Sequence, residues 1–129
     1  MRSQVEQRAQ KRCEYCHAPQ NACGYRFHLE HLRPRTLGGS DAPHNRALAC
    51  ASCNLAKADK VTGIDPVTGE EVALFNPRIN KWSEHFRWSE SQMIEGLTPT
   101  GRATVATLSM NSELRREARE LWFEKGLLP

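Results

Sequence analysis

The sequence predicts a small α+β protein that a bound metal ion helps to hold together. Two Cys-x-x-Cys pairs stand at residues 13–16 and 50–53. Between them, apolar and polar residues alternate from Tyr25 to Glu30, which is the pattern of a half-buried strand. Residues 112–126 carry apolar side chains at helical spacing. These three observations together predict the α+β class.

Length and composition narrow the class of protein further. The chain has 129 residues, the length of one domain, and no apolar run approaches the roughly 18 residues needed to cross a bilayer. We therefore expect a single domain over residues 1–129 and no membrane association. The start, MRSQVEQRAQKR, has no apolar stretch that could act as a secretory signal, which predicts a cytoplasmic protein with reduced cysteines.

The net charge of +3 is unevenly distributed. Basic residues outnumber acidic ones in residues 1–60, whereas acidic residues outnumber basic ones in residues 61–129. A positive face on the half that carries the cysteines would attract a polyanion such as nucleic acid, although the bias is mild.

The first half reads as an arm, a strand, a loop and a short helix. Residues 2–12 are predicted to form a short polar helix or arm. The strand pattern ends at Pro34 and Gly38-Gly39, which predict a loop. Residues 45–61 have few helix breakers and predict a turn followed by a short helix, with the second cysteine pair where that helix begins.

The second half predicts a β-hairpin and two helices. The segments 71–75 and 81–88 are expected to be two strands joined by a tight connection, NPRIN. Thr98 before Pro99 is typical of a helix start, because the threonine side chain can cap the helix. The last helix should end at Gly126 and carry one apolar stripe, composed of Leu114, Ala118, Leu121 and Trp122.

The paired cysteines predict a structural zinc site. Two Cys-x-x-Cys turns supply four thiolates, which complete a closed tetrahedral site, and the four residues are Cys13, Cys16, Cys50 and Cys53. A redox Cys-x-x-Cys normally occurs once, near a βαβ pattern that this sequence lacks. Cys23 is left over and is interpreted as a free thiol. A compact zinc ribbon has roughly 15 to 20 residues between its pairs, whereas 33 residues separate Cys16 from Cys50.

The long insertion carries residue types suited to phosphodiester hydrolysis. That reaction needs an activated water and a cation that neutralises the developing charge. An imidazole such as that of His31 is a suitable general base near neutral pH. A hard cation prefers oxygen ligands, which the Glu30 carboxylate and the Asn54 amide could supply.

Read in order, these residues resemble the HNH endonuclease family, in the form in which the last histidine is an asparagine. The resemblance covers about residues 13–60 and rests on Glu30-His31, Pro34, Gly38-Gly39, Asn45 and CASCNLAK at 50–57. It implies a small ββα-metal core stapled by the four-cysteine zinc site. Residues 61–129 would then be a C-terminal extension of the kind found in this family.

The resemblance also implies roles for individual residues. His31 would activate the water, Asn45 would hold His31 in orientation, and Glu30 and Asn54 would bind the catalytic Mg²⁺ or Mn²⁺. The expected substrate is DNA, cut to leave 5′-phosphate and 3′-hydroxyl ends. Phosphate would be held by basic side chains of the motif, namely Lys57 and Arg33 or Arg35.

Strand geometry leaves one alternative open. Neighbouring residues on a regular strand point to opposite faces, so Glu30 and His31 share a site only if the strand ends or bulges there. On a regular strand, His28 would share a face with Glu30 and could act as a ligand or an accessory residue. Some family members also have a histidine where this chain has Ala58.

A second functional class competes with the nuclease interpretation. The same cysteines could form a zinc-ribbon module that binds nucleic acid without catalysis, or, as a third possibility, a thiol redox protein. His17 and His44 are interpreted as loop residues, His85 as a structural histidine, and the tryptophans as core residues. DNA specificity and oligomeric state, monomer or homodimer, are left open.

Overall fold

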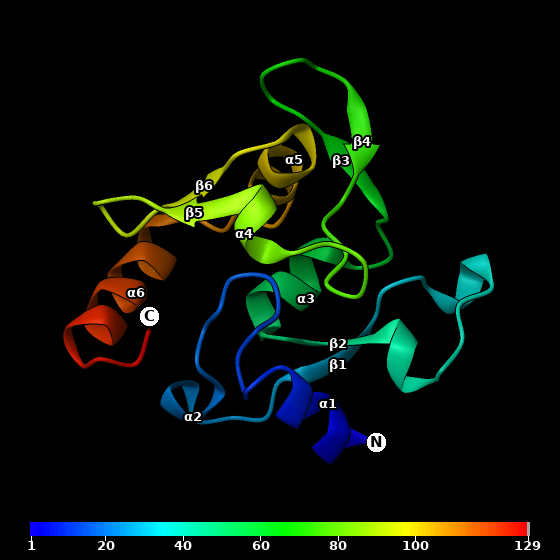
Figure 1. The fold of residues 1–129 in the computed structure, drawn as a ribbon, viewed down its shortest axis with the longest axis horizontal. Helices are drawn as coiled ribbons and strands as arrows, with labels where there is room; N and C mark the ends of the chain where they lie inside the picture. The colour runs from blue at the N-terminus through cyan, green and yellow to red at the C-terminus, as the bar shows by residue number, and fades with distance from the viewer. Residues whose placement is uncertain (129) are drawn as a thin grey trace.

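A computed structural model describes residues 1–128 (Figure 1). It contains elements that the sequence did not predict, and Trp82–His85, in a segment expected to be a strand, is helical. In chain order the elements are α1 (Arg2–Arg8), α2 (Gln20–Cys23), β1 (His28–His31), η1 (Arg35–Leu37), η2 (Pro43–Asn45), β2 (Arg46–Ala49), α3 (Ala51–Lys57), β3 (Thr62–Ile64), β4 (Glu71–Ala73), α4 (Trp82–His85), β5 (Phe86–Trp88), β6 (Ile94–Gly96), α5 (Pro99–Thr107) and α6 (Glu113–Glu124). The α+β class is therefore confirmed. No helix in this part of the chain is long and apolar enough to span a membrane.

A two-stranded antiparallel sheet and one helix form the unit that carries the second cysteine pair. β1 pairs with β2 from His28 opposite Ala49 to His31 opposite Arg46, and α3 follows directly, above the sheet in Figure 1. This is the ββα arrangement that the resemblance implied. The sequence analysis placed only a turn before α3 and missed β2, because the segment RALA has no β-branched or aromatic residue to mark a strand.

Two further hairpins follow, and their pairing differs from the prediction. β4 pairs back with β3, and β5 pairs forward with β6, so the segments 71–75 and 81–88 are not partners. The turn between β3 and β4 explains the first pairing. The Asp65 carboxylate accepts hydrogen bonds from the Val67 backbone and the Thr68 hydroxyl, and Gly69 takes the positive φ that the hairpin loop needs.

The two C-terminal helices are present, but only one packs as predicted. Thr98 caps α5 by accepting a hydrogen bond from the Gly101 backbone, with Pro99 in the first turn, as expected. In α6 the predicted apolar stripe holds only in part, because Trp122 packs against the core and Ala118 is half-buried, whereas Leu114 and Leu121 are 78% and 58% exposed. The buried side chain of α6 is Arg119, which donates hydrogen bonds to the carbonyl oxygens of Gln92 and Met110.

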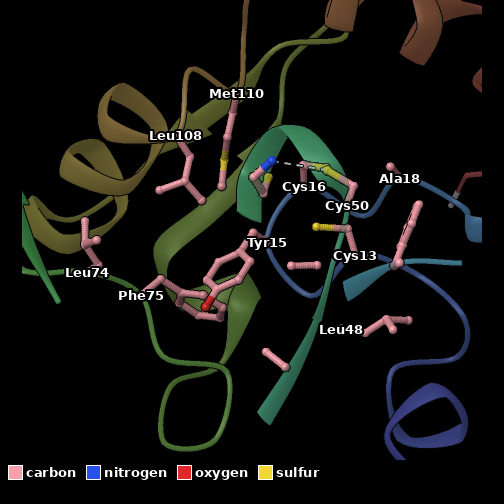
Figure 2. Close-up of a cluster of buried hydrophobic side chains, with 14 of the residues drawn as sticks. Cys13, Tyr15, Cys16, Ala18, Leu48, Cys50, Leu74, Phe75, Leu108 and Met110 are labelled. Atoms are coloured by element: carbon pink, nitrogen blue, oxygen red, sulfur yellow. Dashed lines mark hydrogen bonds between the residues drawn. The ribbon is translucent and has the colours of Figure 1, made fainter. Parts of the chain in front are cut away.

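One continuous cluster of buried side chains joins the two halves of the chain. Tyr15 and Leu48 from the first half meet Phe75, Leu108 and Met110 from the second (Figure 2). Tryptophans pack against the edge of this cluster, as the core interpretation predicted: the Trp82 ring lies 5.1 Å from Phe86 and 5.3 Å from Trp88, centroid to centroid.

Polar contacts reinforce this packing at the segment between the first two cysteines. The Arg78 guanidinium pairs with the Glu14 carboxylate, and the Trp82 indole N–H donates to the Tyr15 carbonyl oxygen at 2.7 Å. The second half of the chain therefore contacts the first cysteine turn directly, through the side chains of Arg78 and Trp82.

Candidate active site and metal centre

The four paired cysteines converge on one point. Their sulfur atoms all lie within 4.8 Å of one another, and the Cys16 and Cys50 sulfurs are 3.7 Å apart (Figure 2). Tetrahedral zinc with bonds of about 2.3 Å places its sulfurs about 3.8 Å apart. All four residues are buried, and within residues 1–128 theirs is the only His, Cys, Asp or Glu cluster with this geometry. The cluster can hold a zinc-type ion.

Turn and helix-cap hydrogen bonds of the backbone fix the positions of these sulfurs. Because the sulfurs are buried, their thiolate forms need a neighbouring positive charge. The turn at Cys13 is closed by the His17 N–H, which donates to the Cys13 carbonyl, while Cys50 is the residue that caps α3. Burial raises the pKa of the Cys13 thiol, so four thiolates can coexist here only around a bound cation. Arg115 of α6 adds positive charge, since its guanidinium donates to the Cys53 sulfur at 2.9 Å. The sequence analysis did not anticipate Arg115.

Strand β1 is regular to its end. The ladder continues to His31 opposite Arg46 without a bulge, so Glu30 and His31 point to opposite faces, and His28 shares a face with Glu30. The alternative that the sequence left open is therefore decided in favour of the regular strand.

Glu30 and His31 nevertheless border a single cleft. The cleft has a volume of about 430 Å³ and runs between β1 and the end of α3; it is lined by His28, Leu29, Glu30, His31, Asn54, Leu55, Ala58 and Asp59. Ala58 ends α3 at φ 49° and ψ −127°, a conformation that residues with a side chain rarely adopt. The structure thus brings Glu30, His31 and Asn54 together, with His28 beside them.

Glu30 is buried and has one free oxygen. Its Oε1 accepts hydrogen bonds from the Lys57 ammonium at 2.8 Å and from the Tyr15 hydroxyl at 3.2 Å. No residue in the described part of the chain donates to its buried Oε2. Burial raises the pKa of Glu30, and the neighbouring Lys57 charge opposes that shift.

The same contact corrects the expectation for Lys57. Its side chain is only 3% exposed and its ammonium faces Glu30 and the His31 carbonyl oxygen. Lys57 therefore neutralises a buried carboxylate and does not present its charge to a phosphate in the solvent.

His31 is hydrogen-bonded to Asp41, which was not among the predicted site residues. Its Nε2 lies 2.7 Å from Oδ1 of Asp41, and the same oxygen accepts from Arg35 Nε at 2.9 Å and Arg46 Nη2 at 3.4 Å. The hydrogen bonds from His31 and Arg35 hold the pKa of Asp41 at about 2. An acidic residue in an otherwise basic loop was the available signal in the sequence.

Asn45 closes the loop that carries Asp41. Its Oδ1 accepts from the Arg33 N–H at 2.9 Å, and its Nδ2 donates to the carbonyl oxygens of Arg33 and Ser40 at 2.9 and 2.7 Å. The expected hold of Asn45 on His31 is therefore not a direct contact. The hydrogen bonds of Asn45 go instead to the backbone of Arg33 and of Ser40, the residue before Asp41.

The remaining candidates lie at the rim of the cleft or away from it. The Arg33 side chain donates to the Leu37 carbonyl oxygen, and Arg35 is 68% exposed. Asn54 is half-buried, and its side-chain amide makes no hydrogen bond within residues 1–128.

The other histidines stand apart from the cleft. His85 is bonded to the Thr98 hydroxyl at 2.6 Å, which agrees with its structural interpretation. His17 is a half-buried loop residue stacked on Trp82, which agrees with its loop interpretation, and desolvation lowers its pKa to about 4. His44 is exposed in η2, as expected for a loop residue.

Comparison with known proteins agrees with the motif. The sequence model of the HNH endonuclease family matches residues 13–60, which hold the cysteine cluster, β1, β2 and α3. No curated protein and no solved structure matches the chain.

The metal centre yields a first prediction. The Cys53→Ser protein should lose its bound metal and unfold, because a unit of two short strands and one helix has too little core to stand alone. Elemental analysis of the purified protein, together with circular dichroism, measures both. Cys23→Ser is the control and should keep the metal, since Cys23 lies outside the cluster. Full metal content and a native spectrum in Cys53→Ser would contradict the assignment.

The loop between β1 and β2, which contains Gly38 and Gly39, yields a second prediction. A Cβ on Gly39 would lie 1.8 Å from the Arg33 carbonyl oxygen and 2.9 Å from Asn45 Nδ2, so Gly39→Ala must break the Asn45 contacts. We expect it to lower the free energy of unfolding by about 3 kcal/mol. Gly38→Ala meets no atom within 4 Å and strains only a positive φ, which costs about 1 kcal/mol. Urea unfolding of the two variants should separate them, and equal losses would refute the clash.

Proposed function

Because residues 13–60 belong to the HNH endonuclease family, we propose that this protein is a metal-dependent endonuclease that hydrolyses DNA phosphodiester bonds. One observation carries the proposal beyond membership of the family. The residues that line a single cleft include His31, Glu30 and Asn54, and within residues 1–128 one buried oxygen of Glu30 and the side-chain amide of Asn54 have no hydrogen-bond partner.

The donor set of the cleft fits a hard divalent ion. The free Glu30 Oε2 and the Asn54 amide oxygen are the two protein ligands that would hold Mg²⁺ or Mn²⁺, with water completing the shell. When bound, such an ion neutralises charge on the phosphate and on the leaving oxygen. A separate zinc ion in the four-cysteine cluster would be structural only, because all four of its ligand positions are filled by protein.

The chain's own groups then perform the remaining steps. His31 removes a proton from the attacking water, since a neutral imidazole is basic enough to do so near neutral pH. The imidazolium that forms is acidic enough to give the proton up again after the reaction. Lys57 keeps the Glu30 carboxylate ionised despite its burial. Arg33 and Arg35, on the loop after β1, attract the DNA backbone by their charge.

We predict that His31→Ala lowers the rate of plasmid cleavage in Mg²⁺ or Mn²⁺ by roughly 10²- to 10⁴-fold, the usual contribution of a general base. The measurement is conversion of supercoiled plasmid to nicked or linear forms by zinc-loaded protein. His44→Ala is the control, because His44 is an exposed histidine of the same unit. Equal cleavage by His31→Ala would remove His31 from the mechanism.

The same assay separates the nuclease from the competing class. A zinc-ribbon module without catalysis would bind DNA with an affinity that falls as salt rises, yet would leave the plasmid intact with every divalent ion. That result with the wild-type protein would replace the proposed function.

The metal ligands are tested by Asn54→Ala. We expect the Mn²⁺ concentration for half-maximal cleavage to rise about 10- to 100-fold, because one of two protein ligands is lost. Stability should change little, since the amide makes no hydrogen bond within the protein as described. Ser52→Ala, on the exposed side of the same helix, is the control. An unchanged Mn²⁺ requirement in Asn54→Ala would exclude Asn54 as a ligand.

A further inference from the structure

The geometry points to Asp41 as a positioning residue for the reaction. We propose that its carboxylate fixes the proton of the His31 imidazole on Nε2, so that Nδ1 is the nitrogen that accepts the proton of the attacking water. The inference rests on the proposed function, because it concerns the residue placed there as the base. It assigns a role to a side chain that belongs to none of the motif positions of the sequence analysis.

The hydrogen bond determines which nitrogen carries the proton. Nε2 of His31 and Oδ1 of Asp41 are 2.7 Å apart, and Arg35 and Arg46 donate to the same oxygen. A carboxylate that faces two guanidinium groups stays ionised and can only accept. Nε2 must therefore be the donor. Nδ1 of a neutral His31 is then unprotonated, and no group within residues 1–128 donates to it.

The backbone just before Asp41 is held by Asn45, which distinguishes this contact from an ordinary surface ion pair. Asn45 Nδ2 binds the Ser40 carbonyl oxygen, one residue before Asp41, at 2.7 Å. Arg46, which follows Asn45, donates from Nη1 to the Leu29 carbonyl oxygen at 2.9 Å on β1, the strand of His31. The carboxylate and the imidazole are thus tied to the same two strands.

A fixed tautomer and ring orientation matter for a general base. A free imidazole exchanges between two tautomers, and only one of them presents a basic nitrogen in a given direction. An ionised acceptor on the other nitrogen holds the ring and stabilises the imidazolium that forms, which is the logic of the aspartate in Ser-His-Asp triads. Partners of this kind typically contribute 10- to 100-fold to activity.

The tautomer can be measured without any activity. In zinc-loaded protein labelled with ¹⁵N-histidine, long-range ¹H–¹⁵N spectra should show neutral His31 with a protonated Nε2 and an unprotonated Nδ1, with His31→Ala identifying the signals. Asp41→Asn should produce a mixture of tautomers, because an amide can donate as well as accept. A single unchanged tautomer in Asp41→Asn would overturn the proposal.

Steady-state kinetics provide a second test of the proposal. With saturating DNA, Asp41→Asn should lower kcat about 10- to 100-fold with little change in KM, whereas Asp41→Glu, which keeps the carboxylate, should restore part of the loss. Glu70→Gln is the matched control for charge, because Glu70 is an exposed residue of the β3–β4 turn and the substitution changes net charge equally. A wild-type kcat in Asp41→Asn would overturn the proposal.

Failure of this inference differs from failure of the proposed function. If the wild type cleaves DNA and His31→Ala does not, a normal Asp41→Asn enzyme refutes only the role of Asp41. If the wild type binds DNA without cleaving it, the proposed function fails and the inference about catalysis fails with it.

Discussion

The convergence of four cysteine sulfurs is the constraint on which the rest of the structure depends. It ties the turn after α1 to the junction of β2 and α3. Two strands of four residues and a helix of seven are too short to fix their relative angle by apolar burial alone. With the junction held, α3 lies at a set distance from β1, and the cleft between them has a defined width. The site of the proposed chemistry is thus a consequence of the cysteine cluster.

The first cysteine turn also connects the cleft to the second half of the chain. Between Cys13 and Cys16, the Glu14 carboxylate pairs with Arg78 and accepts a hydrogen bond from the Leu48 N–H. The Tyr15 carbonyl oxygen accepts a hydrogen bond from the Trp82 indole. The hydroxyl of the same Tyr15 reaches Glu30. Arg115 of α6 contacts the cluster from another direction. Residues 61–128 therefore support the metal centre from outside, and through Tyr15 they also support the carboxylate of the cleft.

Local signals in the sequence were sufficient for some features and insufficient for others. The cysteine spacing and the Thr98 cap depend on residues a few positions apart, and the structure bears both out. Strand pairing depends on which turn joins the strands, and the Asp65 turn pairs β4 with β3 instead of with a strand in residues 81–88. In α6, apolar spacing predicted a buried stripe, but long-range hydrogen bonds of Arg119 turned a charged face inward.

The same division applies to the cleft. The motif identified Glu30, His31 and Asn54, which the structure brings to one cleft, because their spacing is fixed by a short hairpin and helix. The partners that set the charge and orientation of these residues are Tyr15, Asp41 and Lys57. Tyr15 lies in the first cysteine turn at a position to which the motif gave no role, and Asp41 is an exposed loop residue next to Ser40, whose carbonyl oxygen Asn45 binds. Sequence spacing carries no information about such contacts.

At the divalent-ion site proposed for the cleft, the pair of Glu30 and Lys57 would limit the affinity for the ion. Two buried groups of opposite charge cancel, so the site offers no net negative charge to attract a cation. Only the second carboxylate oxygen and a neutral amide are left as ligands. An octahedral ion would keep several waters under these conditions, as Mg²⁺ does in sites where substrate phosphates complete the shell. Under the proposed function this would be a weak site in the free protein, and the phosphate of bound DNA would supply the missing charge.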